Sequence, residues 1–297
     1  MSPRHIRRVA FGLSRAIAGR VGRARVLLGL LAVWATPRAA TGQMIMAAPH
    51  AVVVTDKART GALTLVNTGD KPVEVSLATQ YGYPVTDSAG RMTLRTFDVV
   101  GDTAPSAARW VRFFPERLVV PALGRRTVRL LVSPPPGLPN GEYWSRIVVS
   151  ARGATLPVAG GGAPGIAVGL AVEVRSVLAL FYRQGPVVTG VHLDSVRLAL
   201  EADSLVVRAR LTREGSAAFV GTLRAVVRDS AGTTRAEAAL PLGVYYQLEP
   251  RLALPARALR AGTHTVTLEA ASTRPDVPAS ALVPIETQRH RVSVVIP

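Results

Sequence analysis

Beyond residue 43 the chain is a series of short runs rich in Val, Leu and Thr, separated by Gly, Pro, Asn and Asp. No stretch keeps apolar residues at a helical spacing long enough for a helix, so the pattern predicts an all-β protein. The expected strands in the first half are 51–55, 61–67, 73–79, 110–114, 127–132, 143–151 and 166–182. Those in the second half are 187–193, 196–201, 205–212, 219–229, 234–242, 263–270 and 290–296.

The break between the halves falls at Gln184-Gly185-Pro186, directly after a strong strand. A length of 297 residues favours two domains. We therefore predict two immunoglobulin-like β-sandwich domains, an N-terminal one over 43–185 and a C-terminal one over 186–297. The turns 213–216 and 229–232 are expected to be hairpin connections. The Gly- and Pro-rich segment 153–165 is expected to be the tip of a further hairpin.

The first 42 residues resemble an export signal more than a part of the fold. They contain eight arginines and no acidic residue, which leaves +9 of the formal charge of +17 for the remainder. The apolar run 26–35 directly follows Arg25. It is followed by Pro37 and by the small residues at 39–42, which are typical of a cleavage region. This order predicts a signal peptide over 1–42, cleaved after Gly42, and hence an exported protein. Ten apolar residues are too few for a permanent membrane anchor. Initiation near Val21 or Val26 remains an alternative.

The segment that begins at Ile166 alternates strictly between large apolar residues and small or charged ones. The large residues are Ile166, Val168, Leu170, Val172 and Val174. A half-buried strand shows the same alternation. The second interpretation is an edge strand that aligns an incoming strand of another polypeptide, with main-chain hydrogen bonds supplying affinity and alternate side chains supplying register.

Four motifs occur in a fixed order across the first predicted domain. They are Leu63-Thr64-Leu65-Val66-Asn67-Thr68-Gly69-Asp70-Lys71-Pro72; Phe114-Pro115-Glu116-Arg117-Leu118-Val119-Val120-Pro121 followed by Val128-Arg129-Leu130; Leu138-Pro139-Asn140-Gly141-Glu142-Tyr143-Trp144-Ser145; and Leu180-Phe181-Tyr182-Arg183. In this order and spacing the chain resembles the PapD-like periplasmic chaperones of the chaperone/usher pathway, which assemble pili and fimbriae. The second predicted domain resembles that family poorly.

The resemblance implies that the protein binds secreted pilus- or fimbrial-type subunits and hands them to an outer-membrane usher. In that family the last strand of the first domain completes the subunit's unfinished sandwich, a process called donor-strand complementation. By register from Leu180-Phe181-Tyr182-Arg183, the residues lent to the subunit are Leu170, Val172 and Val174, with Val168 and Ile166 extending the row.

The chain departs from the family at the site that holds the subunit's C-terminal carboxylate. The family uses two basic residues there, and their positions fall at His50 and Ala179 in this sequence. Arg175 and Arg183 are the nearest candidates for a replacement anchor. The alternative for both is an ordinary ion pair within the protein.

Other classes of function find little in the sequence. No cysteine is present, which excludes disulfides and thiolate metal sites, and the five histidines form no metal-binding motif. No nucleophile elbow or phosphate-binding loop occurs, so neither an enzyme nor a cofactor is expected. The net charge of +9 beyond residue 42 is scattered over both domains, so we expect no nucleic acid partner. The alternative function is a structural or adhesive cell-envelope protein built from immunoglobulin-like domains.

Overall fold

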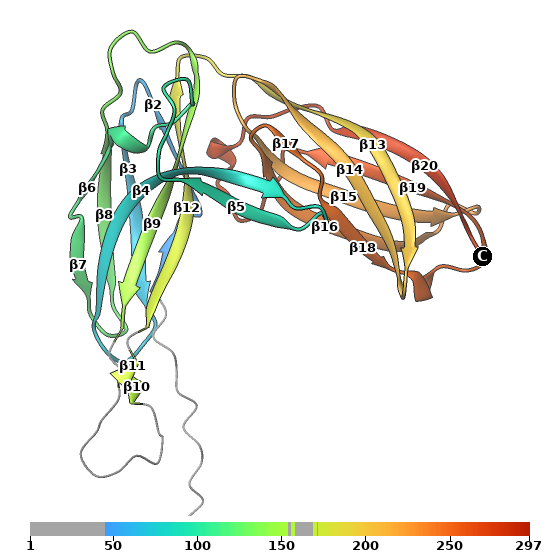
Figure 1. Ribbon diagram of the computed structural model, residues 1–297, viewed down its shortest axis with the longest axis horizontal. Coiled ribbons are helices and arrows are strands. Elements are labelled where there is room, and N and C mark those ends of the chain that lie inside the picture. The colour runs from blue at the N-terminus through green and yellow to red at the C-terminus, as the bar shows by residue number, and fades with distance from the viewer. Residues whose placement is uncertain (1–44, 154–155, 158–168, 171) are drawn as a thin grey trace, which may run out of the picture. The chain divides into compact units, whose positions relative to one another are not determined.

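The computed structural model describes residues 45–153, 156–157, 169–170 and 172–297, which form strands, loops and three short 3-10 turns (Figure 1). The predicted signal peptide, the residues Ile166 and Val168, and most of the segment 153–165 lie outside this range. Within it, no helix is long and apolar enough to cross a membrane. The prediction of an all-β protein with two β-sandwiches is confirmed.

The first sandwich consists of two sheets. One has the order β1 (Ile45–Ala48), β3 (Thr60–Asn67), β8 (Arg125–Val132), β6 (Val111–Phe114). The other has the order β2 (Ala51–Thr55), β12 (Glu173–Gln184), β9 (Gly141–Arg152), β4 (Val73–Thr86), β5 (Met92–Phe97), with β7 (Arg117–Val120) beside β4. Outside both sheets, β10 (Leu156–Pro157) pairs with β11 (Gly169–Leu170).

Alternating side chains explain why these strands form a sandwich. In β8, Val128, Leu130 and Val132 are buried between the sheets. Arg125 and Arg129 on the same strand are exposed, because successive side chains of a strand point to opposite faces. Burial of one apolar face per sheet supplies the main driving force for folding.

The buried side chain of Asn67 fastens the turn after β3. Its Nδ2 donates to the carbonyl oxygens of Lys71 and Pro121 at 2.7 and 3.0 Å, and its Oδ1 accepts from Gly69 N at 2.9 Å. This explains the role of the Asn-Thr-Gly-Asp motif in the sequence: the amide ties the turn to the end of β7.

The second sandwich also consists of two sheets. One pairs β13 (Thr189–Glu201) with β14 (Ser204–Gly215), which pairs in turn with β17 (Gln247–Leu248) and β18 (Arg251–Pro255). The other has the order β16 (Thr234–Val244), β15 (Phe219–Asp229), β19 (Gly262–Ala271), β20 (Gln288–Ile296). Every strand pairing among the described residues joins strands on the same side of Gly185. The domain limits 43–185 and 186–297 stay a prediction.

Three local expectations were wrong. The strand predicted over 166–182 is not continuous, because Val172 lies outside both β11 and β12. The turn 213–216 does not close a hairpin, because β14 and β15 on either side of it belong to different sheets. The runs 187–193 and 196–201 belong to one strand, β13, whose pairing with β14 is shifted by a bulge between Asp194 and Arg197. The turn 229–232 does close a hairpin: β15 pairs with β16, and Asp229 Oδ1 accepts from the backbone nitrogens of Ala231 and Thr233.

The strand β4 is longer than the predicted strand 73–79, and its extra residues 81–86 pair with β5. The tip of this hairpin contacts the second sandwich. Glu249 N donates to Thr86 Oγ1 at 2.9 Å, and Arg251 N donates to Gly90 O at 3.0 Å. Met92 packs against the core of the second sandwich. The β4–β5 hairpin is therefore a direct link between the two sandwiches.

Candidate functional site

The strand β12 is covered unequally along its two edges. On one side it pairs with β9 along its whole length, from Glu173 opposite Arg152 to Gln184 opposite Gly141. On the other side it pairs with β2 only at residues 179–183, in parallel. No strand among the described residues pairs with this side at 173–178. We call residues 173–178 of β12 the open edge (Figure 1).

The main-chain groups along the open edge point away from β9 at alternate residues. Ala179 N donates to His50 O at 3.0 Å, and Arg183 O accepts from Asp56 N at 3.0 Å, so odd-numbered residues face the side of β2. By the same alternation, Val177, Arg175 and Glu173 direct their N–H and C=O groups to the open edge. An unpaired row of this kind is a template for an added strand.

The predicted apolar row continues the buried face of β12. Leu178 and Leu180 are buried in the first core, whereas Val174, on the same face, is 41% exposed. Val172, just before the strand, is also 41% exposed. The main chain of Leu170 pairs with Leu156, while Ile166 and Val168 lie outside the described residues. The row thus runs from the core into solvent.

The opposite face of β12 carries the first candidate anchor, Arg175. Its Nε lies 2.7 Å from Glu173 Oε1, and Arg152 Nε lies 3.3 Å from Glu173 Oε2. The hydrogen bond from Arg175 holds the pKa of Glu173 below its usual value. The side chain of Arg175 is 68% exposed, so this ion pair is open to water and to a competing carboxylate.

The second candidate anchor, Arg183, is committed to a buried ion pair. Its Nε donates to Glu142 Oε2 at 2.9 Å and its Nη2 to Ala281 O at 2.6 Å. The other oxygen of Glu142 accepts from Trp144 Nε1 at 2.9 Å and from Ala218 N at 3.0 Å. The interpretation of Arg183 as an internal ion-pair residue therefore has the stronger geometric support.

The structure brings together the two positions at which the family's basic pair falls, because His50 O accepts from Ala179 N. The residue opposite Ala179 on β9 is Arg146, which sequence reasoning missed. Arg146 is 7% exposed, its Nε donates to Gly82 O at 2.9 Å, and its Nη2 has no hydrogen-bond partner among the described residues. Its guanidinium lies 4.8 Å from the ring centre of Tyr245. Only the register between β9 and β12 could have indicated from the sequence that Arg146 lies opposite Ala179.

Aromatic side chains of both sandwiches gather beside Arg146. They are Tyr81, Tyr83, Phe97, Trp144, Phe181, Tyr245 and Tyr246. The hydroxyl oxygens of Tyr81 and Tyr246 lie 3.1 Å apart, and desolvation raises the pKa of Tyr81 well above its usual value. Seven of the chain's 15 Phe, Trp and Tyr residues thus serve packing between the two sandwiches.

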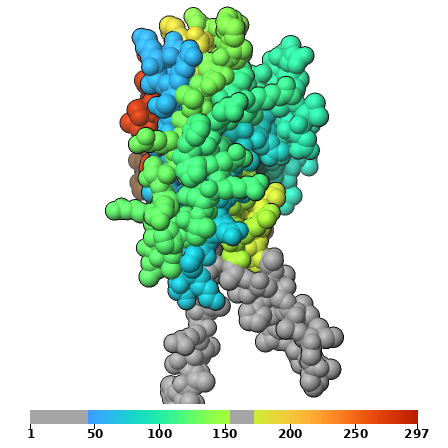
Figure 2. All heavy atoms as spheres, turned by 90° about the vertical axis from the view of Figure 1, so that its left-hand side faces the viewer, coloured from blue at the N-terminus to red at the C-terminus, as the bar shows by residue number. Residues whose placement is uncertain are grey.

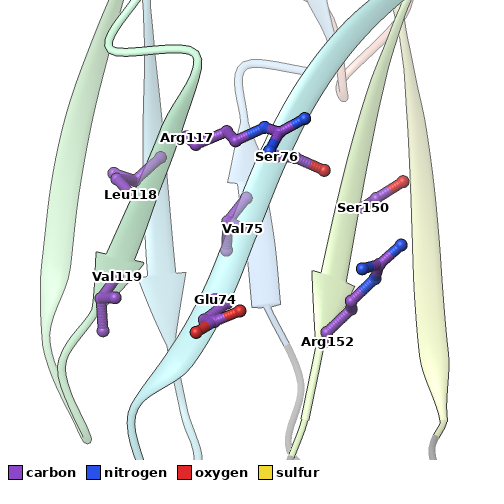
Figure 3. Close-up of a pocket in the computed structure, with 8 residues that line it drawn as sticks. All are labelled: Glu74, Val75, Ser76, Arg117, Leu118, Val119, Ser150 and Arg152. Carbon is purple, nitrogen blue, oxygen red and sulfur yellow. The ribbon is translucent and has the colours of Figure 1, made fainter.

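A shallow pocket of about 390 Å³ lies between β4, β7 and β9 (Figure 3). Glu74, Arg117, Arg152 and two serines give it a polar lining. Arg152 is already paired with Glu173, whereas Arg117 forms no ion pair with any other described residue. Within the part of the chain that the structure describes, no group of His, Asp and Glu is placed to hold a metal ion.

Comparison with known proteins gave matches only among solved structures. No family model and no curated protein matches the chain. The YadV chaperone is similar, with a TM-score of 0.42, 14% identity, and coverage of 84% of this chain and 99% of that chain. The E. coli chaperone DraB is similar with a TM-score of 0.41 and 13% identity, and the match covers 84% of this chain and 96% of that chain.

A third similar structure is the CsuC–CsuE chaperone–tip adhesion subunit pre-assembly complex from Csu pili of Acinetobacter baumannii. It gives a TM-score of 0.41 and 11% identity, and covers 84% of this chain and 97% of that chain. The chain is thus similar to pilus chaperones over most of its length. Because the TM-scores and identities are this low, the similarity carries no argument, and the function has to be argued from the site.

Proposed function

We propose that the protein is a periplasmic chaperone of the PapD-like type, which stabilises pilus- or fimbrial-type subunits by lending them the open edge of β12. The observation that carries the proposal is the unpaired row at 173–178 next to the exposed side chains of Val172 and Val174. The ordered sequence motifs support the same function. The unpaired main-chain groups of this edge can hydrogen-bond an added strand, which supports the donor-strand mechanism.

Strand addition explains both the affinity and the register of such binding. A guest strand would take up hydrogen bonds from Glu173, Arg175 and Val177. Its side chains would then cover Val172 and Val174, each of which is worth at most about 1.5–3 kcal/mol when fully buried, before the cost of ordering the guest. Leu170, Val168 and Ile166 extend this row in our proposal.

The remaining parts of the proposal concern location and partners. The leader 1–42 directs export, and the exported chain has its two sandwiches at 43–185 and 186–297. The partners are secreted subunits and an outer-membrane usher. A subunit that lacks one strand exposes an apolar groove, and a chaperone that fills the groove prevents aggregation.

The proposed anchor for a subunit's terminal carboxylate is Arg175 or Arg183. Arg175 has the better access, because Glu173, its ion-pair partner among the described residues, is at the surface. Arg183 would first have to leave Glu142 and Ala281. We therefore expect Arg175→Ala to weaken client binding and Arg183→Ala to lower the stability of the protein. Undiminished binding in the double variant would remove both residues as anchors.

The decisive experiment is capture of the protein from the periplasm followed by identification of bound polypeptides. The variant Val172→Glu with Val174→Glu should stay folded, because both side chains are half-exposed, and should lose its bound subunits. The matched control is Val188→Glu with Val295→Glu on the second sandwich, where the side chains are 65% and 70% exposed. Equal recovery of partners with both variants would favour the structural or adhesive alternative.

A further inference from the structure

The solvent side of the sheet β1-β3-β8-β6 carries a row of arginines. Arg125 and Arg129 project from β8, and Arg112 projects from β6; all three are exposed. Phe114 lies opposite Arg129 in the strand register and is 54% exposed. Met46, in β1, is 56% exposed. We call these five residues the arginine face. The strands β6 to β8, in green, lie toward the viewer in Figure 2.

The arginine face differs from the rest of the molecule in its charge balance. None of the four strands that form the sheet contains Asp or Glu. Among the described residues, no carboxylate lies within ion-pair distance of Arg112, Arg125 or Arg129. On the other sheet, by contrast, Arg152 and Arg175 are both paired with Glu173. No ion pair with a described residue therefore neutralises the positive charge of the arginine face.

The spacing of the three arginines determines which anion fits them. Arg125 and Arg129 are four residues apart on one strand, which places their Cα atoms about 13 Å apart. Arg112 lies on the next strand, opposite Leu131, so its Cα is roughly 8 Å from that of Arg129. Because strand side chains stand roughly perpendicular to the sheet, the three guanidinium groups stay apart instead of converging on one carboxylate. They match an extended array of separate anionic groups.

We propose that the arginine face docks the protein on the surface of a bilayer that contains anionic lipid. On this face, short side chains separate arginines that lie far apart. Such a face suits a broad anionic surface better than it suits a single acidic peptide strand. Phe114 and Met46 supply apolar side chains of the kind that enter the headgroup region. Because β12 belongs to the other sheet, docking leaves the open edge free for a client. This inference is independent of the chaperone function.

The test is sedimentation with vesicles of equal parts phosphatidylglycerol and phosphatidylcholine, using the exported protein, whose N-terminus is the same in every variant. Each arginine near an anionic surface contributes about fivefold to binding. The triple variant Arg112→Gln, Arg125→Gln, Arg129→Gln should therefore lose roughly a hundredfold in partitioning. Vesicles of phosphatidylcholine alone should bind the wild-type protein no better than they bind this variant.

The matched control removes the same charge elsewhere. Arg228, Arg257 and Arg260 are exposed on the second sandwich, with no ion pair in the described part of the chain. Their triple change to Gln should cost much less binding, and both triples should melt at a similar temperature. Phe114→Ala should lower partitioning severalfold, with a loss that persists in high salt, because salt screens charges and not apolar contacts.

Three outcomes would overturn the proposal. The first is equal loss of vesicle binding in the two triple variants, which would mean that only net charge matters. The second is absence of binding to the phosphatidylglycerol vesicles. The third is binding to soluble polyglutamate that depends on Arg112, Arg125 and Arg129 and exceeds vesicle binding, which would assign the arginine face to an acidic polypeptide. Client recovery through β12 is unaffected by any of these results, so the two proposals fail separately.

Discussion

Arg183 and Glu142 form an ion pair that is almost out of reach of solvent, with Arg183 Nε 2.9 Å from Glu142 Oε2. Their side chains are 12% and 1% exposed. The same carboxylate accepts hydrogen bonds from Trp144, two residues further along β9, and from Ala218, just before β15. One carboxylate therefore satisfies donors from both sandwiches, and the cation of Arg183 is held in place by it.

The first prediction concerns the stability of this pair. Glu142→Ala leaves the buried charge of Arg183 without its carboxylate partner, and it leaves Arg183 Nε, Trp144 Nε1 and Ala218 N without their acceptor. We expect a loss of about 3–5 kcal/mol in the free energy of unfolding. The control is Glu237→Ala, which breaks the exposed pair with Arg224 and should cost about 1 kcal/mol or less. Denaturant unfolding of both variants measures the difference. Similar losses of unfolding free energy in the two variants would show that the buried pair of Arg183 stabilises the protein no more than an exposed pair does.

The second prediction separates main-chain from side-chain recognition at the open edge. Val177→Pro removes an N–H that faces the open edge, so the protein should remain folded while client recovery falls severalfold. Ser176→Pro removes an N–H that faces β9, opposite Val149, and should instead lower stability by about 3 kcal/mol. Periplasmic capture and thermal melting together distinguish these effects. Full client recovery with Val177→Pro would argue against strand addition.

The third prediction concerns the ion pair between Arg175 and Glu173. The pKa of Glu173 is lowered in the folded protein, so this pair adds stability above the ordinary pKa of a glutamate and loses it only as the pH falls through the lowered value. Client binding through Arg175 should therefore change little between pH 7 and pH 5. Glu173→Gln should release the cation and strengthen binding severalfold. Weaker binding in this variant would mean that Glu173 itself contributes to the client site.

The fourth prediction tests the contact between the β4–β5 hairpin and the second sandwich. A Cβ added at Gly90 would lie 2.8 Å from Arg251 Cβ, and the φ of Gly90 is +78°. Gly232 has a similar φ of +81° but nothing within 4 Å of an added Cβ. Both Ala variants incur the strain of a positive φ, of order 1 kcal/mol. Gly90→Ala should cost about 1–2 kcal/mol more, because it also separates the hairpin from β18.

Equal destabilisation by Gly90→Ala and Gly232→Ala would mean that the hairpin contact adds no stability. Exposure of Met92 offers a second readout, since Met92 packs against the second core only while the hairpin is docked. Its rate of oxidation by peroxide should rise in Gly90→Ala and stay unchanged in Gly232→Ala.

Most strands could be predicted from the sequence, because each has one apolar face and ends at a turn residue. The predicted strands 51–55 and 219–229 coincide with β2 and β15. The second half of β4 was missed, since Gly82 and Pro84 normally interrupt strands. Pairing with β5 and contact with the second sandwich hold these residues extended. Such stabilisation comes from residues far away in the chain and leaves no local pattern.

The candidate site was predictable to a similar degree. The alternation through Val172 and Val174 predicted a strand with one apolar face, either half-buried or open to a guest strand. The structure leaves both side chains half-exposed. The partner of Arg183 was not predictable, because Glu142 lies 41 residues earlier. Arg146 was missed for the same reason: its position opposite Ala179 depends on the register of two strands.

The start of β2 limits the space that is available to a guest strand. Because His50 and β2 occupy the edge of β12 from Ala179 onward, a guest strand beside residues 173–178 can extend about 20 Å before it meets them. The strand β2 thus limits the length of a guest strand that can pair there. A shorter guest fits beside β12 without disturbing the fold, whereas a longer one has to displace β2 from its sheet.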